Sequence, residues 1–172
     1  MKAVKIILGI VTVLVVIFFS TGLLIKETTY QVKVQIDKPV AEVFTVFNDQ
    51  EQMKVWMPEL KSIEPINVNP GIVGSEYKMT VENNGQLMEM HEKVMAYVQN
   101  QKVTLYFDAD DMLKTDDFNF SELVDGGTLI EKNVAYKSDS YLMSCLFPYF
   151  KGMFIDIDQK YLDNFKAYIE KQ

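Results

Sequence analysis

The pattern of apolar and polar positions separates a short N-terminal run from the rest of the chain. Residues 6–25 carry no charge. As a helix with a rise of about 1.5 Å per residue, this run spans roughly 30 Å, the hydrocarbon thickness of a bilayer. We therefore expect residues 1–26 to be a membrane anchor with a transmembrane helix at 6–25. A cleaved signal peptide is the alternative, although its apolar region is usually shorter and ends at a small-residue site.

The charges that flank this run predict its orientation. Lys2 and Lys5 precede it, whereas Lys26 and Glu27 follow it and cancel each other. Because positive charges stay on the cytoplasmic side of a membrane, we expect a single-pass protein with a cytoplasmic N-terminus. Residues 27–172 would then form one domain on the extracytoplasmic side.

The domain begins with a strand that leads into two short helices. Residues 30–36 alternate between apolar and polar, which predicts a half-buried strand. Asp37 can cap the helix that follows, and Pro39 suits its first turn. That helix is indicated by apolar residues spaced as on one helical face: Val40, Val43, Phe44 and Phe47. A second helical turn at 53–57 ends before Pro58.

Six strand-like segments and one helix complete the domain. Turn signals such as NPG, NNG and DGG separate the expected strands, which lie at 62–68, 75–81, 87–98, 102–109, 115–124 and 128–136. Consecutive strands joined by short turns form an antiparallel sheet. Residues 150–172 then carry an apolar residue every three or four positions, typical of a long amphipathic helix: Phe154, Ile157, Tyr161, Phe165 and Ile169.

Charge and motifs exclude several classes of function. After residue 26 the chain has 14 lysines and 24 acidic residues, a balance of 14 − 24 = −10, and it has no arginine. Such a domain repels nucleic-acid phosphates and anionic lipid headgroups. The sequence contains no P-loop, no dinucleotide-binding glycine pattern, no G-x-S-x-G and no Cys/His metal spacing. We therefore expect no cofactor, no metal and no nucleic acid, and nothing indicates a protein partner.

Six segments, taken in order, resemble the SRPBCC superfamily, which includes START-like lipid-transfer domains and polyketide-cyclase-like proteins. They are VQIDKPVAEVFTVFND, QMKVWMPELKSIE, GIVGSEYKM, HEKVMAYVQNQKVTLYF, GGTLIEKNVAY and YLDNFKAYIE, and they cover about residues 30–171. The resemblance implies an α+β helix-grip fold, in which a curved antiparallel sheet of about seven strands surrounds a long C-terminal helix. Most small members of this superfamily lack an N-terminal anchor. The anchor expected in this chain therefore argues against a freely diffusing carrier.

In this fold a cavity lies between the sheet and the C-terminal helix. Trp56 would sit where the two short helices meet the sheet, either closing the cavity or simply packing in the core. The same apolar residues could line an open cavity or fill a solid core. The expected lining residues are Trp56, Tyr77, Met79, Met88, Met90, Glu92, Leu105, Phe107, Phe118, Phe120, Met153 and Ile157.

The alternation in 87–98 places Glu92 inward and His91 outward. Even positions from Met88 to Val98 form the more apolar face, so this face should point inward. His91 then faces solvent, and as the only histidine it has no partner for catalysis or metal binding. Burial should raise the pKa of Glu92. The Glu92 carboxylate could act as an acid/base group or as a polar anchor for a ligand. Alternatively, it lies at the rim of the cavity and accepts a hydrogen bond from a Tyr or Thr.

Two further features have structural interpretations. The stretch DADDMLKTDD, which contains Asp108, Asp110, Asp111, Asp116 and Asp117, lacks the ligand order of a calcium loop and is interpreted as an acidic hairpin tip in water. Cys145 has apolar neighbours and no nearby histidine, so we expect a buried, inert thiol.

Three functions fit these observations. The first, which we favour, is a membrane-anchored binding module for a hydrophobic small molecule or lipid. The second is an enzyme of the cyclase or dehydratase type that uses Glu92 and a cavity tyrosine. The third is a tethered protein-interaction scaffold with a filled core. Binding is preferred over catalysis because no catalytic constellation can be assembled from the sequence.

Overall fold

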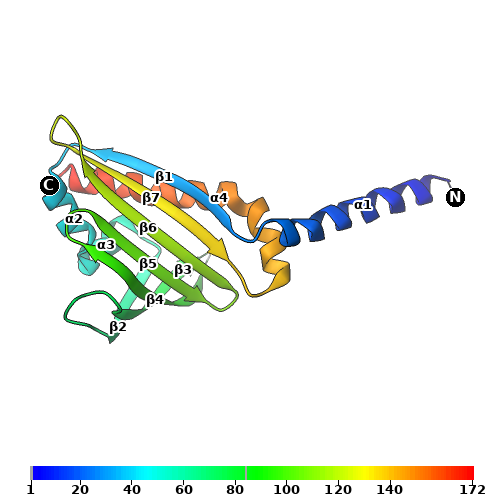
Figure 1. Cartoon of the computed structure of the whole chain (residues 1–172), viewed down its shortest axis with the longest axis horizontal. Coiled ribbons are helices and arrows are strands. Elements are labelled where there is room, and N and C mark those ends of the chain that lie inside the picture. Colours follow the sequence, from blue (N-terminus) through cyan, green and yellow to red (C-terminus); the bar gives the residue numbers. More distant parts are fainter. Residues whose placement is uncertain (1, 84) are drawn as a thin grey trace.

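The computed structural model describes residues 2–83 and 85–172 and shows a curved sheet around one long helix, with a separate helix projecting from one end (Figure 1). The elements are α1 (Lys2–Leu24), β1 (Thr28–Ile36), α2 (Val40–Phe47), α3 (Gln50–Trp56), β2 (Leu60–Asn67), β3 (Glu76–Asn83), β4 (Gln86–Val98), β5 (Lys102–Ala109), β6 (Met112–Glu122), β7 (Thr128–Lys137) and α4 (Tyr141–Ile169). This order is the helix-grip arrangement that the sequence predicts.

The seven strands form one antiparallel sheet in the order β1-β7-β6-β5-β4-β3-β2. The first strand pairs with the last, and every other pair of neighbours is consecutive along the chain. In β1, four apolar side chains on the inner face are buried: Tyr30, Val32, Val34 and Ile36. The inner face therefore packs on α4, while the polar outer residues face solvent.

The two short helices differ from the expected ones at their starts. No side chain caps α2, which begins after Pro39, so the predicted cap by Asp37 is wrong. Instead, the backbone N–H of Asp37 donates to Glu170 near the C-terminus, at 2.9 Å. The second helix starts earlier than expected, because Asp49 accepts from the N–H groups of Glu51 and Gln52 and thereby forms an N-cap.

The C-terminal helix is also longer than predicted. It begins at Tyr141 rather than Phe150 and contains Pro148. A proline removes one helical hydrogen bond and bends the axis, and the first turns of α4 diverge from its long part (Figure 1). Burial of Cys145 and Phe147 compensates for the lost bond. The thiol of Cys145 is buried, as expected.

A β-bulge changes the inner face of β4 near its end. The pairing with β5 shifts between Val94 and Ala96, and a bulge of this kind reverses the side-chain alternation beyond it. Tyr97 consequently packs against Phe44 in the core, with ring centroids 5.3 Å apart, while Val98 is 46% exposed. The prediction that Val98 faces inward was therefore wrong.

The end of α1 packs against the start of α4. Phe18 stacks on Tyr149, Phe19 stacks on Tyr141, and the hydroxyl of Tyr141 donates to the carbonyl of Phe19. Gly22 permits this approach, because a Cβ at this position would lie 2.5 Å from Sγ of Cys145. The rest of α1 is exposed.

Gly22→Val is expected to detach α1 from α4. The added methyl groups cannot fit against Cys145, and overpacking of this kind typically costs about 1–3 kcal/mol. Trypsin should then cleave the full chain after Lys26 several times faster, since the junction loses its support. Gly9→Val is the matched control, because a Cβ at Gly9 meets nothing within 4 Å. Equal cleavage rates for the two variants would contradict the proposed contact.

Candidate functional site

A cavity of about 290 Å³ lies between the inner face of the sheet and α4, and α3 closes one end of it. Nine of the twelve residues expected to line a cavity do so: Trp56, Met79, Met88, Met90, Glu92, Leu105, Phe107, Phe118 and Ile157. The volume is at the lower limit of the range of about 300–1,000 Å³ typical of small-molecule pockets. The space therefore suits a small ligand.

Three of the expected residues lie elsewhere. Tyr77 is on β3 but outside the cavity lining, and Phe120 is buried in an aromatic cluster with Phe44 and Phe47. Met153 is 50% exposed, because the inward stripe of α4 passes through Phe154 instead. Phe154 belongs to the apolar stripe that the sequence predicts, so the phase of the helix was right and only the inclusion of Met153 was wrong.

Trp56 both closes the cavity and packs in the core. Its ring stacks on Phe47 at 5.6 Å and contacts Phe165 edge-on at 5.1 Å. The indole is buried and lines the cavity wall. Its Nε1 has no hydrogen-bond partner among the described residues. The two interpretations of Trp56 from the sequence are therefore compatible with each other.

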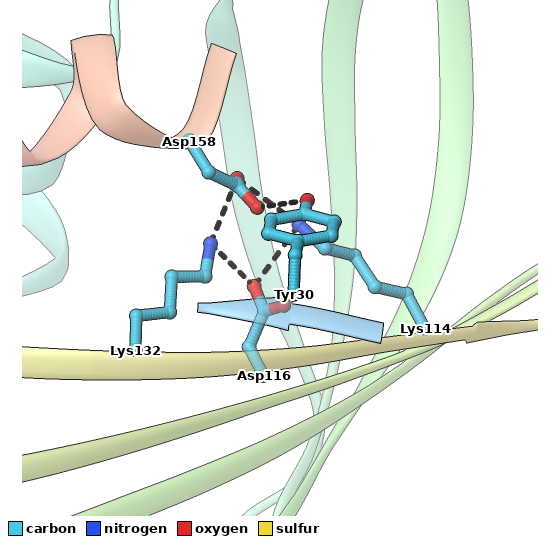
Figure 2. A network of polar contacts seen from close by, with 5 residues as sticks. All are labelled: Tyr30, Lys114, Asp116, Lys132 and Asp158. Carbon is cyan, nitrogen blue, oxygen red and sulfur yellow. Dashed lines mark hydrogen bonds and ion pairs between the residues drawn. The ribbon is translucent and has the colours of Figure 1, made fainter. Parts of the chain in front are cut away.

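Five polar residues form a network beside the cavity (Figure 2), and the four charged ones line it. Asp158 of α4 lies between Lys132 of β7 and Lys114 of β6, with its Oδ1 at 2.8 Å and 3.3 Å from their Nζ atoms. Asp116 contacts the same two lysines through Oδ2, at 2.9 Å and 3.1 Å. Tyr30 of β1 donates its hydroxyl to Oδ2 of Asp158 at 2.5 Å.

These contacts determine the charge states in the network. Burial alone would raise the pKa of Asp158, but the two lysines and the Tyr30 hydroxyl outweigh it and hold that pKa below its usual range. Burial opposes the charge on Lys114 as well, yet Asp116 and Asp158 raise its pKa well above the ordinary value. Burial and the nearby Asp158 raise the pKa of Tyr30. Asp158 and Lys114 are thus ionised at neutral pH.

One oxygen of this network has no partner. Oδ1 of Asp116 is buried and accepts no hydrogen bond from the described part of the chain. The position of Asp116 also corrects the interpretation of the acidic stretch. Asp116 lies inside β6 on its inner face and is buried, and Asp117 accepts from Thr104 on β5. Only Asp108, Asp110 and Asp111 fit the exposed hairpin tip.

Glu92 points inward, as the alternation of β4 predicts. It is 7% exposed and lines the cavity, while its neighbour His91 is exposed. Burial, followed by the charge of Asp116, raises the pKa of Glu92 to about 7. A hydrogen bond from a neighbouring Tyr or Thr was expected, but none to Glu92 is present among residues 2–83 and 85–172. The carboxylate therefore remains available to a ligand.

Known structures share this architecture. No family model matches the chain, and no curated protein matches it in sequence. The crystal structure of Ara h 8.0201 superposes with a TM-score of 0.69 at 18% identity, covering 85% of this chain and 99% of that one. A START superfamily protein from Mycobacterium smegmatis gives a TM-score of 0.67 at 16% identity, covering 83% and 97% of the two chains. The chain has the SRPBCC fold.

A further structural neighbour is SA2116 from Staphylococcus aureus, described as a protein of unknown function. It superposes with a TM-score of 0.69 at 13% identity and covers 84% of this chain and 94% of that one. At such identities the similarity shows the fold alone. The chemistry of the site must therefore be argued from the residues of this chain.

The charged network was not identified from the sequence, although each of its four charged residues interrupts a column of apolar side chains on its strand or helix. Lys114 and Asp116 occupy inner positions of β6 between Met112 and Phe118, and Lys132 lies between Ile130 and Val134 on β7. Asp158 lies on the buried stripe of α4. A charge within a buried column is the signal that could have indicated all four.

Proposed function

We propose that the SRPBCC domain is a membrane-anchored binding module for a small hydrophobic molecule or lipid. The observation that carries this proposal is the open cavity, whose walls combine methionine and aromatic side chains with eight charged residues, seven of which form salt bridges. Methionine is flexible and polarizable, so such walls adapt to apolar ligands of different shape. A few convergent polar groups in an apolar pocket are typical of ligand sites.

The similarity to a START superfamily protein supports this proposal at the level of the fold. The cavity also argues against the scaffold alternative, because a domain with a solidly filled core would not retain a space of about 290 Å³. Its modest volume and charged wall favour a small ligand with one polar end over a large apolar lipid.

Binding is better supported than catalysis because the tyrosines that line the cavity, Tyr136 and Tyr161, are poor proton donors. Burial raises the pKa of both, and Glu59 raises the pKa of Tyr161 further. An acid/base pair of the kind predicted for an enzyme requires a tyrosine free to exchange a proton with the substrate. Glu92 alone does not make such a pair.

The anchoring part of the proposal depends on α1. It is the one helix in the described part of the chain long and apolar enough to span a membrane, and almost all of its surface is exposed. Large apolar side chains are also exposed on the adjoining turns of α4, including Leu142, Tyr149 and Phe150. A membrane at this end of the molecule would cover both surfaces.

The full-length protein is accordingly expected to stay in the membrane pellet after carbonate extraction. Protease added outside spheroplasts should digest the domain, since Lys2 and Lys5 favour a cytoplasmic N-terminus. A mature N-terminus near Leu23 would show cleavage and refute the anchor. Full protection of the domain would reverse the orientation.

The binding proposal is tested by filling the cavity. Met90 lines it from β4, and Met90→Trp adds enough volume to displace a small ligand. We expect this variant to lose binding of an environment-sensitive apolar dye or fatty acid in a thermal-shift assay of the full chain. His91→Ala is the matched control, because His91 follows Met90 directly and its side chain is exposed on the opposite face of the strand.

The control variant should keep wild-type binding and change stability by less than about 0.5 kcal/mol. Loss of dye binding in His91→Ala with retention in Met90→Trp would contradict both the cavity and the register. Absence of binding by the wild type to any apolar probe would instead favour a protein-interaction scaffold.

A further inference from the structure

The charges in the cavity do not balance. Lys114 and Lys132 each contact both Asp116 and Asp158, so two positive and two negative charges cancel within the network (Figure 2). Glu92 lies on the same inner surface, and its carboxylate has no cation beside it among the described residues. An ionised Glu92 therefore leaves the cavity one negative charge in excess.

The other charged groups of the lining cannot supply the missing cation. Glu59 pairs with Lys160 at 3.2 Å, and Glu82 pairs with Lys61 at 2.7 Å. The remaining titratable side chains that line the cavity, Tyr136 and Tyr161, carry no positive charge. The excess charge is thus a property of the whole lining.

The strand registers place Asp116 on the same face of the sheet as Glu92. Glu92 of β4 is opposite Phe107 of β5, and Phe107 is opposite Lys114 of β6. One strand therefore separates β4 from β6, a distance of about 10 Å across the sheet. Asp116 is two residues beyond Lys114 and points to the same face. Its Oδ1 is closed to the cavity, so Asp116 acts on a ligand there through its charge and not through a direct contact of this oxygen.

We infer that the cavity binds a small amphiphile with a protonated amine, whose ammonium contacts the Glu92 carboxylate. This inference rests on the binding function proposed above and specifies its ligand. An ammonium group offers three N–H donors and one positive charge, so it would donate to the Glu92 carboxylate and neutralise the excess charge. The apolar body of the ligand would contact Met79, Met88 and Met90.

A carboxylate head group fits this site less well. Lys114 and Lys132 are the cations that could receive it, but each already contacts two carboxylates. A bound carboxylate would also double the negative excess in a poorly solvated space, where like charges repel strongly. A neutral hydroxyl can satisfy one acceptor but leaves the charge of Glu92 unpaired.

Three ligands of nearly equal size test the inference: phenylbutylamine, phenylbutanol and phenylbutyrate. Each is titrated into the full chain in phosphatidylcholine vesicles, with the fluorescence of Trp56 as the readout, because this single tryptophan lines the cavity. At pH 8 we expect the amine to bind at least about tenfold more tightly than the alcohol and the carboxylate to bind most weakly.

Glu92→Gln should reduce the preference for the amine over the alcohol to within about twofold, since it removes the charge and keeps the shape. Glu89→Gln is the control, because Glu89 is exposed on the outer face of the same strand. The amine should also lose its advantage at pH 5.5, where Glu92, with a pKa of about 7, is protonated. Phenylbutylamine itself stays charged at both pH values, as alkyl ammonium groups do.

The possible outcomes test the amine inference and the proposed binding function separately. Equal binding of the three compounds would overturn the amine inference and leave the binding function standing. The tightest binding by phenylbutyrate would show that the lysines select the head group, and it would overturn the inference as well. A preference for the amine that persists in Glu92→Gln would refute the role of Glu92. If none of the three binds, the proposed binding function fails together with the inference.

Discussion

Replacing Asp158 with alanine is expected to lower the free energy of unfolding of the domain by about 3–5 kcal/mol, because removal of one partner leaves an uncompensated buried charge. Asp158 is 3% exposed and contacts both buried lysines, at 2.8 Å and 3.3 Å. In the variant, Lys114 and Lys132 would share Asp116 alone, and the hydroxyl of Tyr30 would lose its acceptor. Urea unfolding of the full chain in detergent micelles, followed by the fluorescence of Trp56, measures this loss.

Asp156→Ala is the matched control for this prediction. Asp156 lies two residues earlier on α4 and is exposed, so its removal should change stability by less than about 0.5 kcal/mol. If the two variants unfold at the same urea concentration, the buried network contributes no net stability and its role is confined to the cavity.

The network also predicts how stability falls in acid. The folded-state pKa of Asp158 is lower than that of an unfolded carboxyl group, about 3.9. The stabilisation from its ionised form is therefore fully present above about pH 4 and is lost as the pH falls toward the folded-state pKa. Asp158→Ala should lack this component of acid unfolding.

The sequence predicts the fold well because its signals are local. Alternation in β1 and in the first part of β4 identified strands and their inner faces, and these faces are observed. The bulge after Val94 could not be predicted, because it depends on the pairing with β5 rather than on β4 alone. The early start of α4 depends on packing of Cys145 against Gly22 of α1, another contact between distant segments.

The charged network illustrates the same limit. Each lysine and aspartate could have been recognised as an interruption of an apolar column, but their mutual contacts could not. Lys132 and Asp158 are 26 residues apart and meet only because α4 crosses the inner face of β7 at this height. Asp116 meets Lys132 through the register between β6 and β7, with Asp116 opposite Val134. Prediction of the site therefore required the tertiary structure.

Replacing Glu92 with glutamine is expected to raise the free energy of unfolding at pH 8 by about 2–3 kcal/mol. Burial and the charge of Asp116 raise the pKa of Glu92 from 4.5 to about 7, a difference worth about 3 kcal/mol at 1.36 kcal/mol per pH unit. A carboxyl group with a raised folded-state pKa imposes no penalty below its unfolded pKa. The penalty grows as the pH rises from about 4.5 to 7 and is constant above that value. Glutamine has the size of glutamate without its charge, so it removes the penalty.

The dependence of this effect on pH is its sharpest test. The wild type should lose stability between pH 5 and pH 8 relative to Glu92→Gln, whereas the two proteins should be nearly equal at pH 4.5. Glu89→Gln, on the exposed face of the same strand, should run parallel to the wild type throughout. A constant difference between wild type and Glu92→Gln at all pH values would show that the carboxylate is already paired in the folded domain. That result would also remove the unbalanced charge on which recognition of an amine depends.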